Sequence, residues 1–139
     1  MGRYEDFQAY RAKMNARIIG DDDERRRIVD GSPRPLAPGE PPPQGATVVT
    51  RRFFRLDGQA YEPGALPAKT KELLGLVASA VLRCDDCVAY HVDRCVAHGT
   101  SDEELWEALD VALIVGGSIV IPHLRRAIEF LDEARSKAR

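Results

Sequence analysis

A cysteine pair and a histidine at helical spacing are the most reactive feature of this sequence. The segment CDDCVAYH carries Cys84, Cys87 and His91, and Cys95 follows one turn later. On a helix, at about 100° per residue, these four positions fall within one roughly 80° arc. Cys84 and Cys87 can then meet sulfur to sulfur, and His91 lies within reach of Cys87. A CxxC pair supports reversible disulfide chemistry, in which one thiol reacts as a thiolate and the second resolves the intermediate.

A CxxC motif alone is a weak signal, and other uses of the cysteines remain open. Zinc sites normally combine two such knuckles; only one is present, so no metal site is predicted. Inert buried cysteines are a second alternative, but Asp85 and Asp86 argue against an apolar environment for the pair. We expect Cys95 to be a small buried residue. His123 is compatible with a core, interface or site-rim position.

A glutamate upstream makes the pattern specific. Glu72 lies twelve residues before Cys84, which gives Glu72-x11-Cys84-x2-Cys87-x3-His91. With the downstream segments LWEALDVALIVGGSIV and IPHLRRAIEF, this pattern resembles the alkyl hydroperoxide reductase D-like branch of the carboxymuconolactone decarboxylase family. The resemblance covers about residues 61–131. Decarboxylases of this family lack the CxxC pair, so its presence points to the redox branch.

The resemblance implies an all-α fold, assembly as a homotrimer or homohexamer, and an enzyme that is a thiol peroxidase or disulfide reductase. In such enzymes the residue corresponding to Cys87 forms a sulfenic acid, and the one corresponding to Cys84 donates a proton and resolves it to the disulfide. Glu72 and His91 correspond to a proton relay. The implied substrate is a hydroperoxide, the reductant is a dithiol carried by a dihydrolipoyl protein, and a peroxiredoxin can be a further partner. No bound cofactor is expected.

Two features complicate this assignment. Cys84 is nearer the expected helix N-terminus, where the helix dipole favours a thiolate, so helix geometry alone would make Cys84 the nucleophile. Well-studied peroxidases of the branch have a histidine before the second cysteine, where this chain has Asp86. An adjacent anion raises the pKa of a thiol, which favours weaker peroxidase activity or a protein or lipoyl disulfide as substrate. A decarboxylase or lactone-processing enzyme and a non-catalytic redox-sensing oligomer are the alternative functions.

Helices with short breaks must position these residues. Apolar residues at intervals of three and four predict the first helix, prolines predict a loop, and Ser101 with Glu104 forms a capping-box pattern. Gly99 suits a left-handed helix end. The expected elements are a helix over 3–18, a proline-rich loop over 21–45, and helices over 48–61, 67–83 and 84–99. A further helix is expected to open at 101, with a bend or close helix crossing allowed at 116–117, and a last helix to cover 118–138. The expected organisation is an N-terminal helix (1–20) packed on a helical redox domain (48–139) through a linker (21–47).

Composition excludes several broad classes. The 139 residues include 20 basic and 22 acidic side chains, a net charge of −2, which disfavours nucleic-acid binding. No uncharged apolar run reaches the roughly 18 residues that cross a bilayer, and the N-terminus lacks the apolar stretch of a signal peptide. We therefore expect a cytoplasmic protein without a membrane partner. The apolar segment 108–121 suggests an oligomer interface, and equally a core helix.

Overall fold

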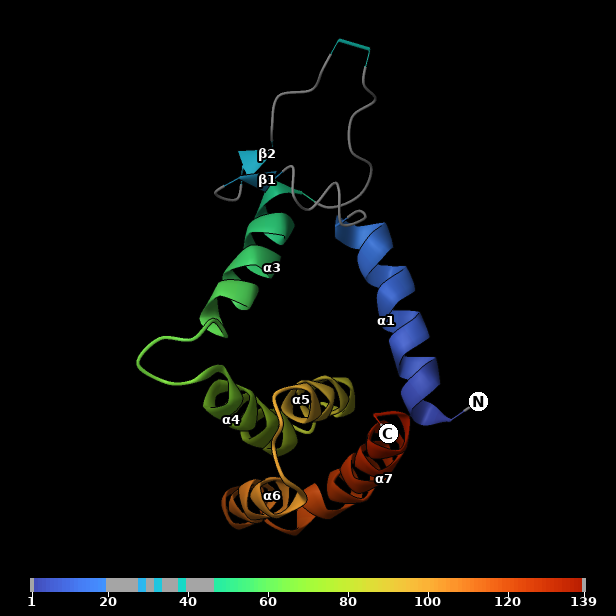
Figure 1. Cartoon of the computed structure of the whole chain (residues 1–139), viewed down its shortest axis with the longest axis vertical. Coiled ribbons are helices and arrows are strands. Elements are labelled where there is room, and N and C mark those ends of the chain that lie inside the picture. Colours follow the sequence, from blue (N-terminus) through green and yellow to red (C-terminus); the bar gives the residue numbers. More distant parts are fainter. Residues whose placement is uncertain (1, 20–27, 30–31, 34–37, 40–46, 139) are drawn as a thin grey trace. The chain divides into compact units, whose positions relative to one another are not determined.

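The fold is all-α, as the sequence predicts. The computed structural model describes residues 2–19, 28–29, 32–33, 38–39 and 47–138. The helices are α1 (Arg3–Ile19), α3 (Val48–Ala60), α4 (Ala68–Val81), α5 (Asp85–Ala97), α6 (Asp102–Gly116), a 3-10 turn (Ser118–Val120) and α7 (Ile121–Lys137) (Figure 1). The only strands in these described ranges are β1 (Ile28–Val29) and β2 (Ser32–Pro33), an antiparallel pair of two residues each. A pair this short adds no layer to the fold.

The chain divides into two compact units. One consists of Met1–Phe7 and Glu62–Arg139, and the other of Gln8–Tyr61. Most of the predicted proline-rich loop, at 20–27, 30–31, 34–37 and 40–46, lies outside the described residues. The predicted division at 20 and 47 therefore stays a prediction.

Local sequence signals fix several helix ends. The side chain of Ser101 accepts a hydrogen bond from the Glu104 backbone, and the Glu104 side chain accepts one from the Ser101 backbone, which completes the predicted capping box. Gly99 has a φ of 74°, as expected of a glycine that ends a helix, and Gly117 has a φ of 80° where α6 ends. These caps separate α5 from α6, and α6 from the 3-10 turn that leads into α7.

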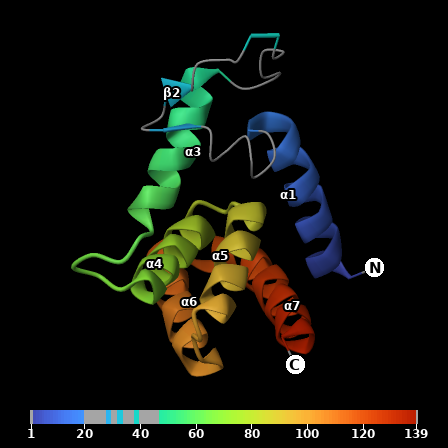
Figure 2. The same cartoon turned by 45° about the horizontal axis from the view of Figure 1, so that its top comes forward.

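The core of the first unit lies among α4, α5, α6 and α7. Helix α4 packs against α5 and α6, and α5 packs against α7, as Figures 1 and 2 show. Phe130 of α7 and Leu76 of α4 are completely buried there. The first turns of α1 join this core, because Tyr4 and Phe7 place their rings 5.2 and 5.5 Å from the ring of Phe130. The packing of α4 on α5 brings the predicted site residues together.

Among the described residues, no helix combines the length and apolar character that a membrane crossing requires.

Candidate active site

The two cysteines of the CxxC motif flank the start of α5. They form a disulfide with an S–S distance of 2.08 Å. Cys84 was predicted to be the first residue of the helix, but it is the N-cap of α5. The residue before it, Arg83, has a φ of 60°, which turns the chain sharply between α4 and α5. The backbone N–H of Cys87 donates a hydrogen bond of 3.3 Å to Cys84 Sγ. The sulfur of Cys84 therefore occupies the position of an N-cap acceptor, where a helix terminus stabilises negative charge.

The cysteines differ in exposure. Cys87 is exposed, whereas Cys84 is half-buried. Cys87 is therefore the more solvent-accessible residue of the pair. The sulfur of Cys84, in contrast, accepts a hydrogen bond from a backbone N–H, which would stabilise a negative charge on that sulfur.

Glu72 and His91 form a buried hydrogen-bonded pair between α4 and α5. Glu72 Oε2 lies 2.8 Å from His91 Nδ1, and the side chains are only 3% and 9% exposed. Arg94 Nε lies 3.9 Å from the second carboxylate oxygen of Glu72. A carboxylate at Nδ1 fixes the imidazole so that Nδ1 carries a proton and Nε2 is the basic nitrogen. The geometry suits a histidine that accepts and returns a proton.

Gly75 is a site residue that the sequence reasoning missed. A Cβ atom placed on it would lie 2.5 Å from Cε1, 2.7 Å from Nε2 and 2.8 Å from Nδ1 of His91. Real Cβ atoms do not approach other atoms so closely, so the imidazole packs directly on the backbone of α4. A glycine inside a helix costs about 1 kcal/mol relative to alanine, and Gly75 lies one turn after Glu72 on the same helix face. An unfavourable glycine inside a predicted helix, one turn after Glu72, was the sequence signal that could have identified Gly75.

A second ionic cluster joins the motif to α7. Asp85 Oδ1 lies 2.7 Å from Nδ1 of His123, and Arg126 Nη1 donates a hydrogen bond of 3.1 Å to Asp85 Oδ2. His123 therefore lies at the rim of the site, one of the three positions its sequence context allowed. Asp86, the other acid of the motif, is exposed.

Cys95 is completely buried, as expected. Burial, and secondarily the negative charge of Glu72, raises the pKa of its thiol to about 12. Among the described residues, no three or more His, Cys, Asp or Glu side chains are grouped as a metal ion would require. The thiol chemistry of this part of the chain thus centres on Cys84 and Cys87.

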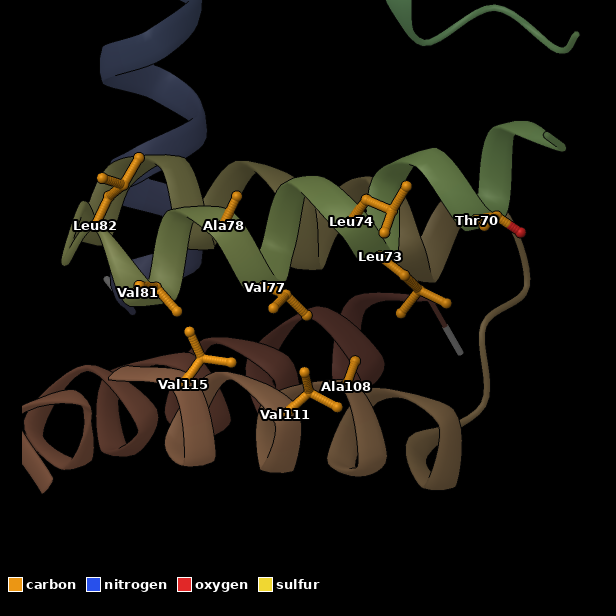
Figure 3. Close-up of a pocket in the computed structure, with 10 residues that line it drawn as sticks. All are labelled: Thr70, Leu73, Leu74, Val77, Ala78, Val81, Leu82, Ala108, Val111 and Val115. Carbon is orange, nitrogen blue, oxygen red and sulfur yellow. The ribbon is translucent and has the colours of Figure 1, made fainter. Parts of the chain in front are cut away.

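An apolar groove lies between α4 and α6. Figure 3 shows Val77 and Val81 of α4 pointing towards Val111 and Val115 of α6. The groove has a volume of about 560 Å³. This α4–α6 groove is lined by Thr70, Leu73, Leu74, Val77, Ala78, Val81, Leu82, Ala108, Val111 and Val115. Several of these side chains are exposed, among them Leu82 at 76% and Val115 at 68%.

This all-helical fold and its CxxC site match a known class of proteins. The family model of the carboxymuconolactone decarboxylase family matches residues 48–130, so the chain belongs to that family. The Glu72, Cys84, Cys87 and His91 pattern is consistent with its alkyl hydroperoxide reductase D-like branch.

Solved structures support the same assignment. A carboxymuconolactone decarboxylase family protein of Thermotoga maritima, with a suggested involvement in antioxidative response, is 66% identical and has a TM-score of 0.65; the match covers 66% of this chain and 95% of that one. An apo family protein of Legionella pneumophila is 30% identical with a TM-score of 0.59, over 62% of this chain and 77% of that one.

Two curated relatives are also similar. An uncharacterized protein of Cupriavidus necator is 32% identical over 73 residues, which are 52% of this chain and 65% of that protein's length. An uncharacterized protein of the cox locus of Paracoccus denitrificans is 30% identical over 95 residues, which are 68% of this chain and 85% of that protein.

Proposed function

We propose that this protein is a thiol–disulfide oxidoreductase that reduces hydroperoxides with a dithiol donor. The observation that carries the proposal is the Cys84–Cys87 disulfide together with the buried Glu72–His91 pair, whose histidine lies one helical turn after Cys87 on α5. A redox-active pair needs a base to form its thiolate, and an imidazole oriented by a carboxylate is such a base.

The cycle has three balanced steps. His91 takes the proton of the Cys87 thiol, and the thiolate attacks the peroxide, giving Cys87 sulfenic acid and an alkoxide that is protonated to the alcohol. Cys84 then attacks the sulfenic sulfur, so that the disulfide forms and water leaves. A dithiol, of the dihydrolipoyl type, reduces the disulfide and is itself oxidised to a cyclic disulfide.

The different environments of the two sulfurs support these roles. The exposed Cys87 is open to a peroxide in the first step and to the donor thiolate in the third. Cys84 is suited to leave as a thiolate in the third step, because the backbone N–H of Cys87 points at its sulfur. Helix geometry alone would make Cys84 the nucleophile, whereas the family resemblance implies Cys87. The two are compatible in this cycle, because the helix dipole stabilises the thiolate of the leaving sulfur, Cys84, rather than that of the attacking sulfur, Cys87.

Turnover with dihydrolipoamide and an organic hydroperoxide tests the proposal. Wild type should consume both in equal amounts, and Cys87→Ser should abolish turnover. Cys84→Ser should allow a dimedone-type reagent to label sulfenic acid at Cys87 without repeated cycling. If the label instead requires Cys84, the two roles are reversed.

If wild-type thiols are not consumed by peroxide, the peroxidase is excluded. Direct exchange with a lipoyl or peroxiredoxin disulfide is then the remaining enzymatic role, to which the exposed anion of Asp86 would be less of a barrier. Decarboxylase or lactone chemistry gives no reason for the CxxC pair, and a redox sensor would form the disulfide without turnover.

We propose further that the protein is a cytoplasmic homotrimer or homohexamer. The α4–α6 groove and the neighbouring Ile114, which is 87% exposed, support self-association. Exposed apolar patches of this kind commonly mark interfaces.

A further inference from the structure

The cluster of Asp85, His123 and Arg126 has no role in the cycle described above. It is nevertheless attached to the redox motif, because Asp85 is the first residue of α5 and the direct neighbour of Cys84. Both oxygens of its carboxylate are engaged by α7, one by each partner. A simple surface ion pair contributes about 0–1 kcal/mol to stability, which would not by itself explain two partners on one carboxylate.

The charge of Asp85 opposes the chemistry of its neighbour. When a donor thiolate attacks Cys87, the S–S bond breaks, the donor bonds to Cys87, and the electron pair leaves on Cys84 as a thiolate. A carboxylate one residue away disfavours that second negative charge. Arg126 carries a permanent positive charge. His123 donates a hydrogen bond to the same carboxylate when its Nδ1 is protonated.

We propose that Arg126 and His123 are positioning residues that offset the charge of Asp85 and hold it away from the Cys84 sulfur, which favours departure of the Cys84 thiolate. This inference rests on the proposed function for its purpose, because a leaving thiolate matters only if the disulfide is cycled. The effect on Cys84 itself does not depend on peroxide or donor. It therefore can be measured separately.

The test measures the alkylation rate of Cys84 with iodoacetamide across pH in the Cys87→Ser background, with labelled peptides identified by mass spectrometry. Only the thiolate reacts, so the rate at neutral pH reports the ease of forming it. Arg126→Gln should slow labelling of Cys84 roughly three- to tenfold, by raising the pH at which the thiolate forms. Asp85→Asn should accelerate it, and the double variant should return near the starting rate.

The direction of these effects separates a charge role from a structural anchor. If the cluster only holds α5 against α7, Asp85→Asn and Arg126→Gln break the same contact and must change the rate in the same direction. Opposite directions support the proposal, and equal directions overturn it. Arg125→Gln is the matched control, because it removes the same charge from an exposed neighbour on α7. A change as large as that of Arg126→Gln would also overturn the proposal.

A second readout uses the chain with both cysteines intact. Equilibration with lipoamide and dihydrolipoamide gives the fraction of disulfide, and Arg126→Gln should favour the disulfide several-fold at neutral pH because the reduced state loses its stabilised thiolate. An unchanged equilibrium with unchanged labelling would overturn the proposal. Peroxidase failure in wild type, with the labelling effects present, would overturn only the proposed function.

Discussion

At the scale of single residues, the site depends on contrasts between neighbours of the same type. Cys84 caps a helix, Cys87 is exposed, and Cys95 is completely buried. His91 is held by a buried carboxylate, whereas His98 lies at the exposed end of α5, where its Nε2 is 3.2 Å from Arg94. Environment rather than residue type thus assigns a different chemistry to each cysteine and histidine.

His91→Ala and Glu72→Gln should each slow dithiol-driven turnover. General-base assistance is typically worth about 10²–10⁴-fold, and His91→Ala should lose an amount in this range. Glu72→Gln should lose less, because Gln still accepts a hydrogen bond from Nδ1 but does not stabilise the imidazolium. Steady-state rates with dihydrolipoamide measure both.

His98→Ala is the control for this experiment, since it removes an exposed histidine from the same helix. It should retain nearly the wild-type rate. A His91→Ala variant that remains folded by circular dichroism and turns over normally would disprove the relay.

Cys95 should not react in the folded protein. Its thiol pKa of about 12 lies above the ordinary value of 9.0, so the thiolate required for alkylation is negligible at pH 8. Mass spectrometry after iodoacetamide treatment of the reduced protein should show two labels in the native state and three in denaturant.

The same raised pKa predicts the alkaline stability profile. Between pH 9 and about 12 the unfolded chain loses the Cys95 proton while the folded chain keeps it. Unfolding is therefore favoured progressively as the pH rises through this interval. In denaturant titrations, Cys95→Ala should show a weaker decline over this range than wild type, and an equal decline would contradict the assignment.

At the scale of helices, the sequence predicted where several helices begin and end, but not how the residues at the site pair between helices. The helices over 3–18 and 48–61 and the capping box at Ser101 were predicted to within a residue or two, because these depend on local periodicity and capping. The N-cap position of Cys84 was missed, since it depends on the positive φ of Arg83, which has no local sequence signal. The pairing of Asp85 with α7 was missed as well, because it joins residues 38 positions apart.

Gly75→Ala should impair the site while leaving the helix intact. Alanine favours the helix by about 1 kcal/mol, but its Cβ atom would overlap the His91 ring. The imidazole must move, so turnover should fall at least tenfold, and the His91 ring signals should shift in an NMR spectrum.

Gly58→Ala is a closely matched comparison. Gly58 lies inside α3, and a Cβ atom there would meet nothing within 4 Å. This variant should be more stable by about 0.5–1 kcal/mol, with unchanged turnover. Equal turnover in the two variants would show that the close contact at Gly75 has no role in positioning His91.

At the scale of the whole molecule, the first unit has large apolar side chains on its surface in addition to those buried in its core. The segment 108–121 was compatible with either a core helix or an interface, and its apolar residues are divided between buried and exposed positions. Leu109 and Ala112 are buried, whereas Val111, Ile114 and Val115 are exposed. Periodicity identified the apolar residues of α6 but could not indicate which side would face the core, because that depends on the packing of α4 and α7.

Val115→Glu should disrupt self-association. A charge in the α4–α6 groove must be desolvated when two copies meet, but costs little in a monomer because Val115 is exposed. Light scattering coupled to size exclusion should show a trimer or hexamer for wild type and smaller species for the variant. Ser136→Glu, which adds the same charge at an exposed position of α7, should leave the mass unchanged; a monomeric wild type would refute the assembly.

The N-cap position of Cys84 also makes α5 a reporter of its own redox state. The amide of Cys87 donates to a disulfide sulfur in the oxidised protein, and after reduction the same amide would face a thiol or a thiolate, a stronger acceptor. The strength of the hydrogen bond from this amide therefore depends on whether the disulfide is oxidised or reduced. The nitrogen and proton frequencies of that single amide would follow each turn of the cycle in real time, without any added label.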